Sequence, residues 1–255
     1  MANETQGLAL SSTGNSGILG LSFPFEASIP DTSGTTILEN LLSPFNDSDR
    51  YFAVKLGRDG ANSSFTIGEL DPTVANSPDD ITYTAVTPFA HNIYDYWKMP
   101  LQYLTINSTT FPLSSSGVPG ASAPIAVFDT GTTLILGPSD DVDRFWQSVG
   151  ASRKTDDGWQ VRCDRGVSIG FVLGEGAGQK EYVLDPADLS WLQGLRDGDW
   201  CFGGVQANDG VCVQFTLYVL LRGSCRMPNI IPGFVWRLAS RRYVPSSKSS
   251  PSNQI

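Results

Sequence analysis

The chain has 255 residues, enough to bury a core and to form one or two domains. Its 26 glycines, 16 prolines and modest charge favour a turn-rich β protein over a helical bundle. Residues 1–210 hold all 26 acidic side chains and 11 basic ones (net −15), whereas residues 211–255 hold six basic ones and no acid (net +6). The acidic body argues against a nucleic-acid partner, and no apolar stretch approaches the ~20 residues that span a bilayer.

Hydrophobic periodicity along the chain predicts short strands, two helices and a shorter third helix. Apolar residues and glycines at 17–24 predict a buried strand that ends at Pro24. Helical spacing predicts helices over 35–42 and 139–149, the second capped by Ser139 with acids in its first turn. The remaining elements are expected to be strands at 51–57, 65–72, 81–86, 99–106 and 159–163, a hairpin over 167–184, and a short helix after a turn at 185–189.

Between residues 125 and 138, two apolar runs flank a single acid, Asp129. Asp is disfavoured in strands and costly to bury when ionised, so this carboxylate needs hydrogen-bond partners. The hydroxyls of Thr130, Thr132 and Thr133 lie beside it in sequence, and Gly131 allows a sharp turn that brings a backbone N–H close. The residues alone are also compatible with an ordinary hairpin turn.

The motif resembles the second catalytic motif of the pepsin-like aspartic proteases, fungal type included. That motif reads hydrophobic-hydrophobic-Asp-Thr-Gly-Thr/Ser-Ser/Thr, then apolar residues and Gly-Pro, and every position is filled between Val127 and Pro138. Two other aspartate loops do not fit: a phosphorylated-aspartate ATPase loop needs Lys at position 130, and a haloacid-dehalogenase loop needs Asp at position 131. The resemblance extends over roughly residues 14 to 210.

The resemblance implies a mostly β, bilobal β-barrel fold that is incomplete in these residues. Residues 1–77 correspond to the trailing part of the first lobe and residues 78–210 to the second lobe, with a turn-rich junction at 72–80. The family's first Asp-Thr-Gly is expected eighty-odd residues before the segment 18–20, and the 255 residues contain only the motif at 129–131.

By resemblance, Asp129 is the second-lobe catalytic carboxylate. Thr130 is expected to cross-link the two active-site loops, Thr132 to hydrogen-bond the outer carboxylate oxygen, and Gly131 to offer its N–H. The other residues to which the resemblance assigns a place are Thr133 in the same loop, Tyr96 and Leu134 at the substrate cleft, Ile18, Leu19 and Gly20 threading the first-lobe loop, and a Cys163–Cys201 disulfide. No cofactor is implied, and a single His excludes a multi-His metal site.

Residues 211–255 depart from the family pattern. The hydrophobic-hydrophobic-Gly strand that accompanies the second active-site loop is not recognisable there, and the charge changes sign. We interpret residues 211–237 as the product of a frameshift, a retained intron or a gene-model error, with a genuine divergent tail as the alternative. The pairing of Cys212 and Cys225 stays open.

The resemblance implies peptide-bond hydrolysis at acid pH by a monomeric enzyme acting on peptides or proteins, with no nucleic-acid partner and no membrane span. Because the first Asp is absent, we expect this chain alone to be inactive. The alternatives are a non-catalytic binding homologue of the fold and a homodimeric single-motif protease. Secretion or a vacuolar location is suggested by the family and by sequons at Asn3, Asn46, Asn62 and Asn107, although the chain begins with no signal peptide.

Overall fold

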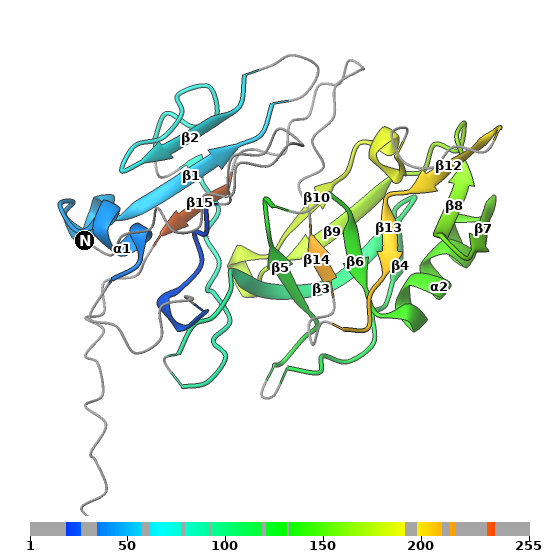
Figure 1. Cartoon of the computed structure of the whole chain (residues 1–255), viewed down its shortest axis with the longest axis horizontal. Coiled ribbons are helices and arrows are strands. Elements are labelled where there is room, and N and C mark those ends of the chain that lie inside the picture. The colour runs from blue at the N-terminus through cyan, green and yellow to red at the C-terminus, as the bar shows by residue number, and fades with distance from the viewer. Residues whose placement is uncertain are drawn as a thin grey trace, which may run out of the picture.

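We describe the chain from a computed structural model, which defines residues 19–26, 35–57, 62–77, 80–91, 93–118, 121–131, 133–191, 198–210, 215–217 and 234–237. Strands dominate, and two α-helices, α1 (Ile37–Leu42) and α2 (Ser139–Val149), lie at the periphery (Figure 1). Four short 3₁₀ helices complete the described elements, at Pro24–Glu26, Asp47–Asp49, Gly176–Gly178 and Pro186–Leu189. The prediction of a mostly β protein is confirmed.

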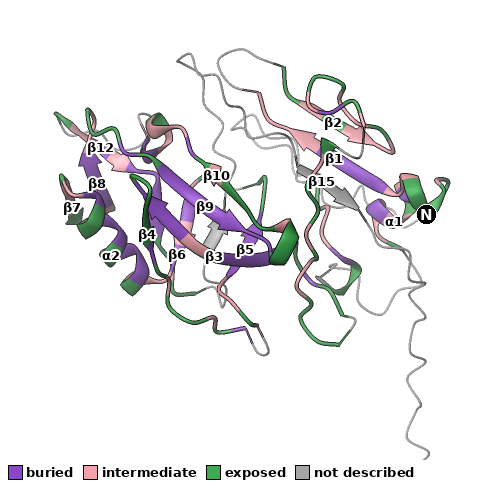
Figure 2. Ribbon diagram, turned by 180° about the vertical axis from the view of Figure 1, so that it is seen from behind, coloured by how far each residue is buried: buried purple, intermediate pink, exposed green. Residues whose placement is uncertain are grey.

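The largest sheet has eight strands and lies beneath the Asp129 motif. Its order is β10 (Lys180–Val183), β9 (Ile169–Leu173), β3 (Lys98–Ile106), β5 (Ile125–Phe128), β14 (Phe215–Leu217), β6 (Ile135–Gly137) and β13 (Val205–Ala207), with β4 (Thr109–Phe111) paired to β3. Every residue of β5 and β9 is buried, as the continuous apolar runs indicate (Figure 2). The sheet therefore presents the motif from its interior, not from an edge.

Helix α2 covers one end of this sheet together with a four-stranded sheet. That second sheet has the order β11 (Ser190–Trp191), β12 (Trp200–Gly203), β8 (Gly158–Arg162) and β7 (Ser152–Thr155). Val142, Phe145, Trp146 and Val149 recur at helical spacing, and all four are buried, so α2 turns one apolar face inward. The indole Nε1 of Trp146 donates to the carbonyl of Val205 at 2.9 Å, which ties α2 to β13.

A separate three-stranded sheet, in the order β15 (Phe234–Arg237), β1 (Tyr51–Lys55) and β2 (Ser64–Ile67), carries the first part of the chain. Helix α1 begins with a capping box: the Glu39 N–H donates to the Thr36 hydroxyl, and the Glu39 carboxylate accepts from the Thr36 N–H. Phe52 on β1 packs edge-on against Trp97, with ring centroids 5.5 Å apart. This aromatic contact joins the three-stranded sheet to the start of β3.

Three local predictions are wrong. Residues 81–86 form no strand, because they are exposed or half-buried and no neighbouring strand pairs with them in the described part of the chain. Ser139 does not cap α2 with its own side chain; instead its N–H and hydroxyl both donate to the Asp209 carboxylate. These two hydrogen bonds lower the pKa of Asp209. Residues 19–24, the described part of the buried strand predicted over 17–24, form no strand either, and Leu19 is 56% exposed.

The disulfide between Cys163 and Cys201 is present, as the resemblance implied. It joins the end of β8 to β12 across a sequence separation of 38 residues. Closing a loop of that length stabilises the native state by roughly 3–4 kcal/mol in the chain-entropy model. The bond therefore fixes the four-stranded sheet against which α2 packs. Cys212 and Cys225 lie outside the described residues.

Candidate active site

Asp129 lies at the surface directly after the buried strand β5. The chain turns at once, and the N–H of Gly131 donates to Asp129 Oδ1 at 2.8 Å. A Cβ atom at position 131 would stand 3.1 Å from the same oxygen, closer than most carbon contacts, so glycine lets the backbone approach the carboxylate. A rigid strand thus delivers an exposed, hydrogen-bonded carboxylate.

The loop after Asp129 spans a split between two strands. Strands β5 and β6, which the loop connects, are not neighbours, because β14 lies between them (Figure 1). Strand β14 is parallel to β5, with Thr216 opposite Val127, and antiparallel to β6, with Thr216 opposite Leu136. Because β14 pairs with both β5 and β6, it separates the two ends of the Asp129 loop by one strand.

Strand β14 was not predicted, because residues 211–217 do not match the family's usual pattern. A weaker signal was present: apolar and polar residues alternate over 213–217, as in a strand. Only its position in the sheet, between β5 and β6, identifies this short segment as part of the site. Residues 215–217 therefore belong to the sheet, although they lie in the segment that departs from the family pattern.

Strand β3 supports β5 from its other side. Lys98 lies opposite Val127, and the N–H of Phe128 donates to the Trp97 carbonyl at 2.9 Å. The strand pairing ends there, because β3 begins at Lys98 and the Lys98 N–H donates to the Tyr96 carbonyl at 2.8 Å, which turns the chain. Tyr96, expected at the substrate cleft, is 43% exposed, and its place beside Asp129 stays a prediction.

The other site candidates are distributed unevenly. Thr130 and Thr133 are exposed in the Asp129 loop, and Leu134 is half-buried where the loop enters β6. Leu19 and Gly20 lie at the surface, and the first-lobe loop that they are expected to thread is not part of the sequence. Thr132 and Ile18 fall outside the described residues. The specific roles assigned to these side chains stay predictions.

The model of one protein family, described as eukaryotic aspartyl protease, matches residues 1–216. The chain belongs to that family. The match ends within β14 and covers Phe215 and Thr216 of the strand between β5 and β6. The family resemblance stated from the Asp129 motif is therefore confirmed.

Individual members of the family show the same relation. Chymosin of Camelus dromedarius is 26% identical over 214 residues, covering 81% of this chain and 50% of chymosin. Aspartic protease pepA of Arthroderma otae is 30% identical over 75% of this chain, and major aspartyl peptidase 1 of Cryptococcus neoformans is 27% identical over 82%. The chain spans about half the length of the curated relatives it matches.

Neither a metal site nor a membrane-spanning helix is found among the described residues. No group of three or more His, Cys, Asp or Glu side chains within them is placed to hold a metal ion. No helix in that part of the chain is long and apolar enough to cross a membrane.

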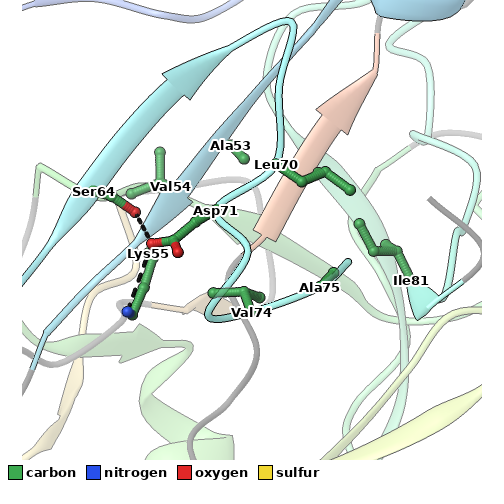
Figure 3. Close-up of a pocket in the computed structure, with 9 residues that line it drawn as sticks. All are labelled: Ala53, Val54, Lys55, Ser64, Leu70, Asp71, Val74, Ala75 and Ile81. Carbon is green, nitrogen blue, oxygen red and sulfur yellow. Dashed lines mark hydrogen bonds and ion pairs between the residues drawn. The ribbon is translucent and has the colours of Figure 1, made fainter. Parts of the chain in front are cut away.

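A small depression on the three-stranded sheet is a separate feature (Figure 3). Apolar side chains line most of it, and its polar end consists of groups that bind one another: the Ser64 hydroxyl donates to Asp71 Oδ2 at 2.6 Å, and Lys55 Nζ lies 3.6 Å from that oxygen. Lys55 Nζ also donates to the Thr73 hydroxyl. We interpret the depression as structural, because its hydrogen-bonding groups satisfy each other.

Asp71 gives the first part of the chain a defined dependence on pH. Hydrogen bonds from the Ser64 hydroxyl, then from the Thr73 hydroxyl and N–H, and the charge of Lys55 hold the pKa of Asp71 far below its usual range. A depressed folded-state pKa adds stability that is present above the unfolded pKa of about 3.9 and is lost as the pH falls toward the folded value. Asp71 therefore remains ionised in the folded chain at a pH where the unfolded carboxyl takes up its proton.

The substitution Asp71→Asn tests this. We expect the Asp71→Asn variant to be less stable than the wild type at neutral pH, and the difference to shrink below about pH 4, where the unfolded carboxyl takes up its proton. Urea unfolding at several pH values measures both curves. Glu69→Gln is the control, because it removes a charge from an exposed neighbour. A difference that stays constant down to about pH 2 contradicts the assignment.

Proposed function

We propose that this chain supplies one of the two catalytic carboxylates of an acid endopeptidase, and that Asp129 is that carboxylate. The observation that carries the proposal is the position of Asp129. Its carboxylate is exposed directly after the buried strand β5 and accepts a hydrogen bond from the Gly131 N–H. The loop that holds it connects β5 to β6, and β14 lies between these two strands. The family match supports peptide-bond hydrolysis as the chemistry.

In the proposed reaction, two carboxylates share one proton and hold a water molecule between them. Carboxylates about 3 Å apart cannot both ionise at low cost, so one pKa rises and the other falls, which suits acid pH. The ionised partner takes a proton from the water as its oxygen attacks the scissile carbonyl carbon, and the protonated partner gives its proton to the carbonyl oxygen, which forms a tetrahedral diol. The C–N bond then breaks as the carboxyl that took the water proton passes it to the amide nitrogen, while the other carboxylate takes a proton back from a diol hydroxyl, which releases an amine and a carboxylic acid.

The 255 residues contain one Asp-Thr-Gly, so the second carboxylate has to come from outside them. It is supplied either by a further segment of the same gene product or by another polypeptide. On this proposal the isolated chain does not cleave peptides, and its substrate, a peptide or protein, binds along the face that carries Tyr96, Asp129 and Leu134.

The transcript tests this proposal. We expect an in-frame Asp-Thr-Gly to be encoded 5′ of the codon for residue 1, some eighty residues before the segment 18–20. A transcript that encodes no such motif there contradicts a single-chain protease. The sequence would then favour the non-catalytic binding homologue.

A homodimer is the second candidate, because a second copy would bring a second Asp129. Equilibrium sedimentation at about pH 4 measures it directly. A dimer whose proteolysis is lost in Asp129→Asn would establish it and overturn the single-chain form. A monomer excludes it.

We also propose that the protein is secreted or vacuolar. The Cys163–Cys201 disulfide supports an oxidising compartment. The sequon residues Asn46, Asn62 and Asn107 are all exposed, so each is accessible to carry a glycan. Asn107 is placed at the tip of the β3–β4 hairpin with a φ of 49°.

A further inference from the structure

A buried ion pair lies at the start of β3. Lys98 is 2% exposed and Asp95 is 6% exposed, and the Lys98 Nζ atom lies 2.8 Å from Asp95 Oδ1 and 2.9 Å from Oδ2. The same ammonium faces the ring of Phe89 at 5.8 Å from its centroid. Removing two charges from water is costly, so such a pair adds little net stability and calls for another reason to be present.

The pair sets the geometry of a tight turn. Asp95 Oδ1 accepts from the N–H of Tyr96 at 2.8 Å while its carboxylate holds the ammonium three residues on. The N–H of Lys98 donates to the Tyr96 carbonyl at 2.8 Å. Backbone and side chains of residues 95–98 are thus fixed relative to one another, and Trp97 stands at the centre.

This turn is connected on one side to the Asp129 strand. The Trp97 carbonyl accepts from the N–H of Phe128 at 2.9 Å, and Asp129 is the next residue. Lys98 continues the contact opposite Val127. A displacement of the 95–98 turn would therefore shift the last hydrogen bond of β5 before the carboxylate.

On its other side the turn is connected to residues 21–23. Trp97 Nε1 donates to the Leu21 carbonyl at 2.8 Å, and the Asp95 carbonyl accepts from the Ser22 hydroxyl at 2.5 Å and from the Phe23 N–H at 3.3 Å. The rings of Phe23 and Trp97 pack with centroids 4.4 Å apart. Residues 95–98 thus form a bridge between the first part of the chain and the strand that ends at Asp129.

We propose that Asp95 and Lys98 are positioning residues for Asp129. Their ion pair fixes the turn, the turn fixes the Trp97 carbonyl, and that carbonyl fixes the Phe128 amide from which Asp129 projects. The proposal rests on Asp129 being the functional carboxylate, but it concerns where that side chain is held. Its test therefore measures position and needs no catalysis, so its failure and the failure of the proposed function are distinguishable.

The test uses the full chain with its aspartate carboxyl carbons labelled for NMR. The single variant Lys98→Met leaves Asp95 without its cation and is expected to be strongly destabilised. The double variant Asp95→Asn with Lys98→Met contains no buried charge at this point, so its urea unfolding is expected to return close to wild type. We nevertheless expect the Asp129 carboxyl resonance to move in the double variant, and the Phe128 amide to exchange about tenfold faster.

The matched control is the other buried Asp paired with a cation three residues on, Asp141 with Arg144 in α2. The double variant Asp141→Asn with Arg144→Met removes an Asp–cation pair of the same spacing from helix α2, whereas the strands that pair with β5 are β3 and β14. We expect it to leave the Asp129 resonance and the Phe128 exchange rate unchanged. If it moves them as much as the 95/98 double variant does, the effect is general destabilisation and the proposal fails.

If the double variant does not fold, the single variant Asp95→Glu tests the same ion pair. Asp95→Glu retains the charge pair but lengthens one arm by a methylene. We expect it to fold and to shift the Asp129 resonance, because the turn must adjust. If the Asp129 resonance keeps its wild-type position in every folded variant at this pair, the proposal is overturned.

Discussion

Replacing Trp146 by Ala is expected to lower the free energy of unfolding by about 4 kcal/mol. Trp146 is fully buried on the inner face of α2, stacks 6.2 Å from Trp159 and meets Phe145 edge-on at 5.2 Å. The truncation creates a cavity the size of an indole and leaves the Val205 carbonyl without its donor. Urea unfolding of the two proteins, at a pH where both are folded, measures the difference.

Two control variants separate the contributions. Trp146→Phe keeps most of the ring volume but removes the N–H donor, so we expect a loss of about 1–3 kcal/mol. Gln147→Ala changes the exposed neighbour on the same helix and is expected to stay within about 0.5 kcal/mol of wild type. A Trp146→Ala protein as stable as Gln147→Ala would contradict the packing described for α2.

The packing of Trp146 is connected to the Asp129 loop by strand β13. Val205 on β13 lies opposite Ile135 on β6, and the Ile135 N–H donates to the Gly204 carbonyl at 2.9 Å. A Cβ atom at Gly203 would clash with the Trp146 ring, so the chain entering β13 rests directly on the indole. Trp146 thus supports β13, which pairs with β6 after the Asp129 loop. Trp97 in turn supports β5 before that loop.

The elements that the sequence predicts well are those with a strong local signal. Helix α2 shows a helical repeat of large apolar residues, and its predicted span, 139–149, matches Ser139–Val149. The helix predicted over 35–42 is likewise present, as α1 (Ile37–Leu42). The Asp129 motif is also contiguous, and the expected Gly131 N–H contact is present two residues away, whereas the catalytic role of Asp129 stays a proposal.

The features that could not be predicted depend on residues distant in sequence. The cap of α2 comes from Asp209, which lies 70 residues after Ser139. Asp141 was interpreted as an acid at a helix start, yet it is fully buried and accepts from the N–H and hydroxyl of Ser114. The burial of Lys98 depends on Asp95 and on the packing of residues 21–23, none of which a strand pattern encodes.

Strand β14 shows the same limit at the site itself. Its three residues have a strand-like alternation, but that signal is too short to separate a strand from a tail under different sequence rules. What identifies it is the pairing with β5 on one side and β6 on the other. A sequence motif can therefore name the carboxylate without revealing the strand on which its loop is built.

The second large effect concerns activity and is all-or-none. A lone carboxylate has no coupled partner to stay protonated and polarise the scissile carbonyl, so the water-activating step cannot be completed. Asp129 is the only Asp of an Asp-Thr-Gly in the sequence. We therefore expect the monomeric 255-residue chain to be folded, with its Asp129 loop in place, and still to release no peptides.

The most direct test of this account is cleavage of a denatured protein by the purified monomeric chain at about pH 3–5, with Asp129→Asn measured in parallel. The substitution keeps the size of the side chain and removes its ability to accept a proton. We expect peptide release from both proteins to equal that of a blank without either. Turnover by the monomer that disappears in Asp129→Asn would show that these residues hold a complete catalytic centre, and would contradict the account.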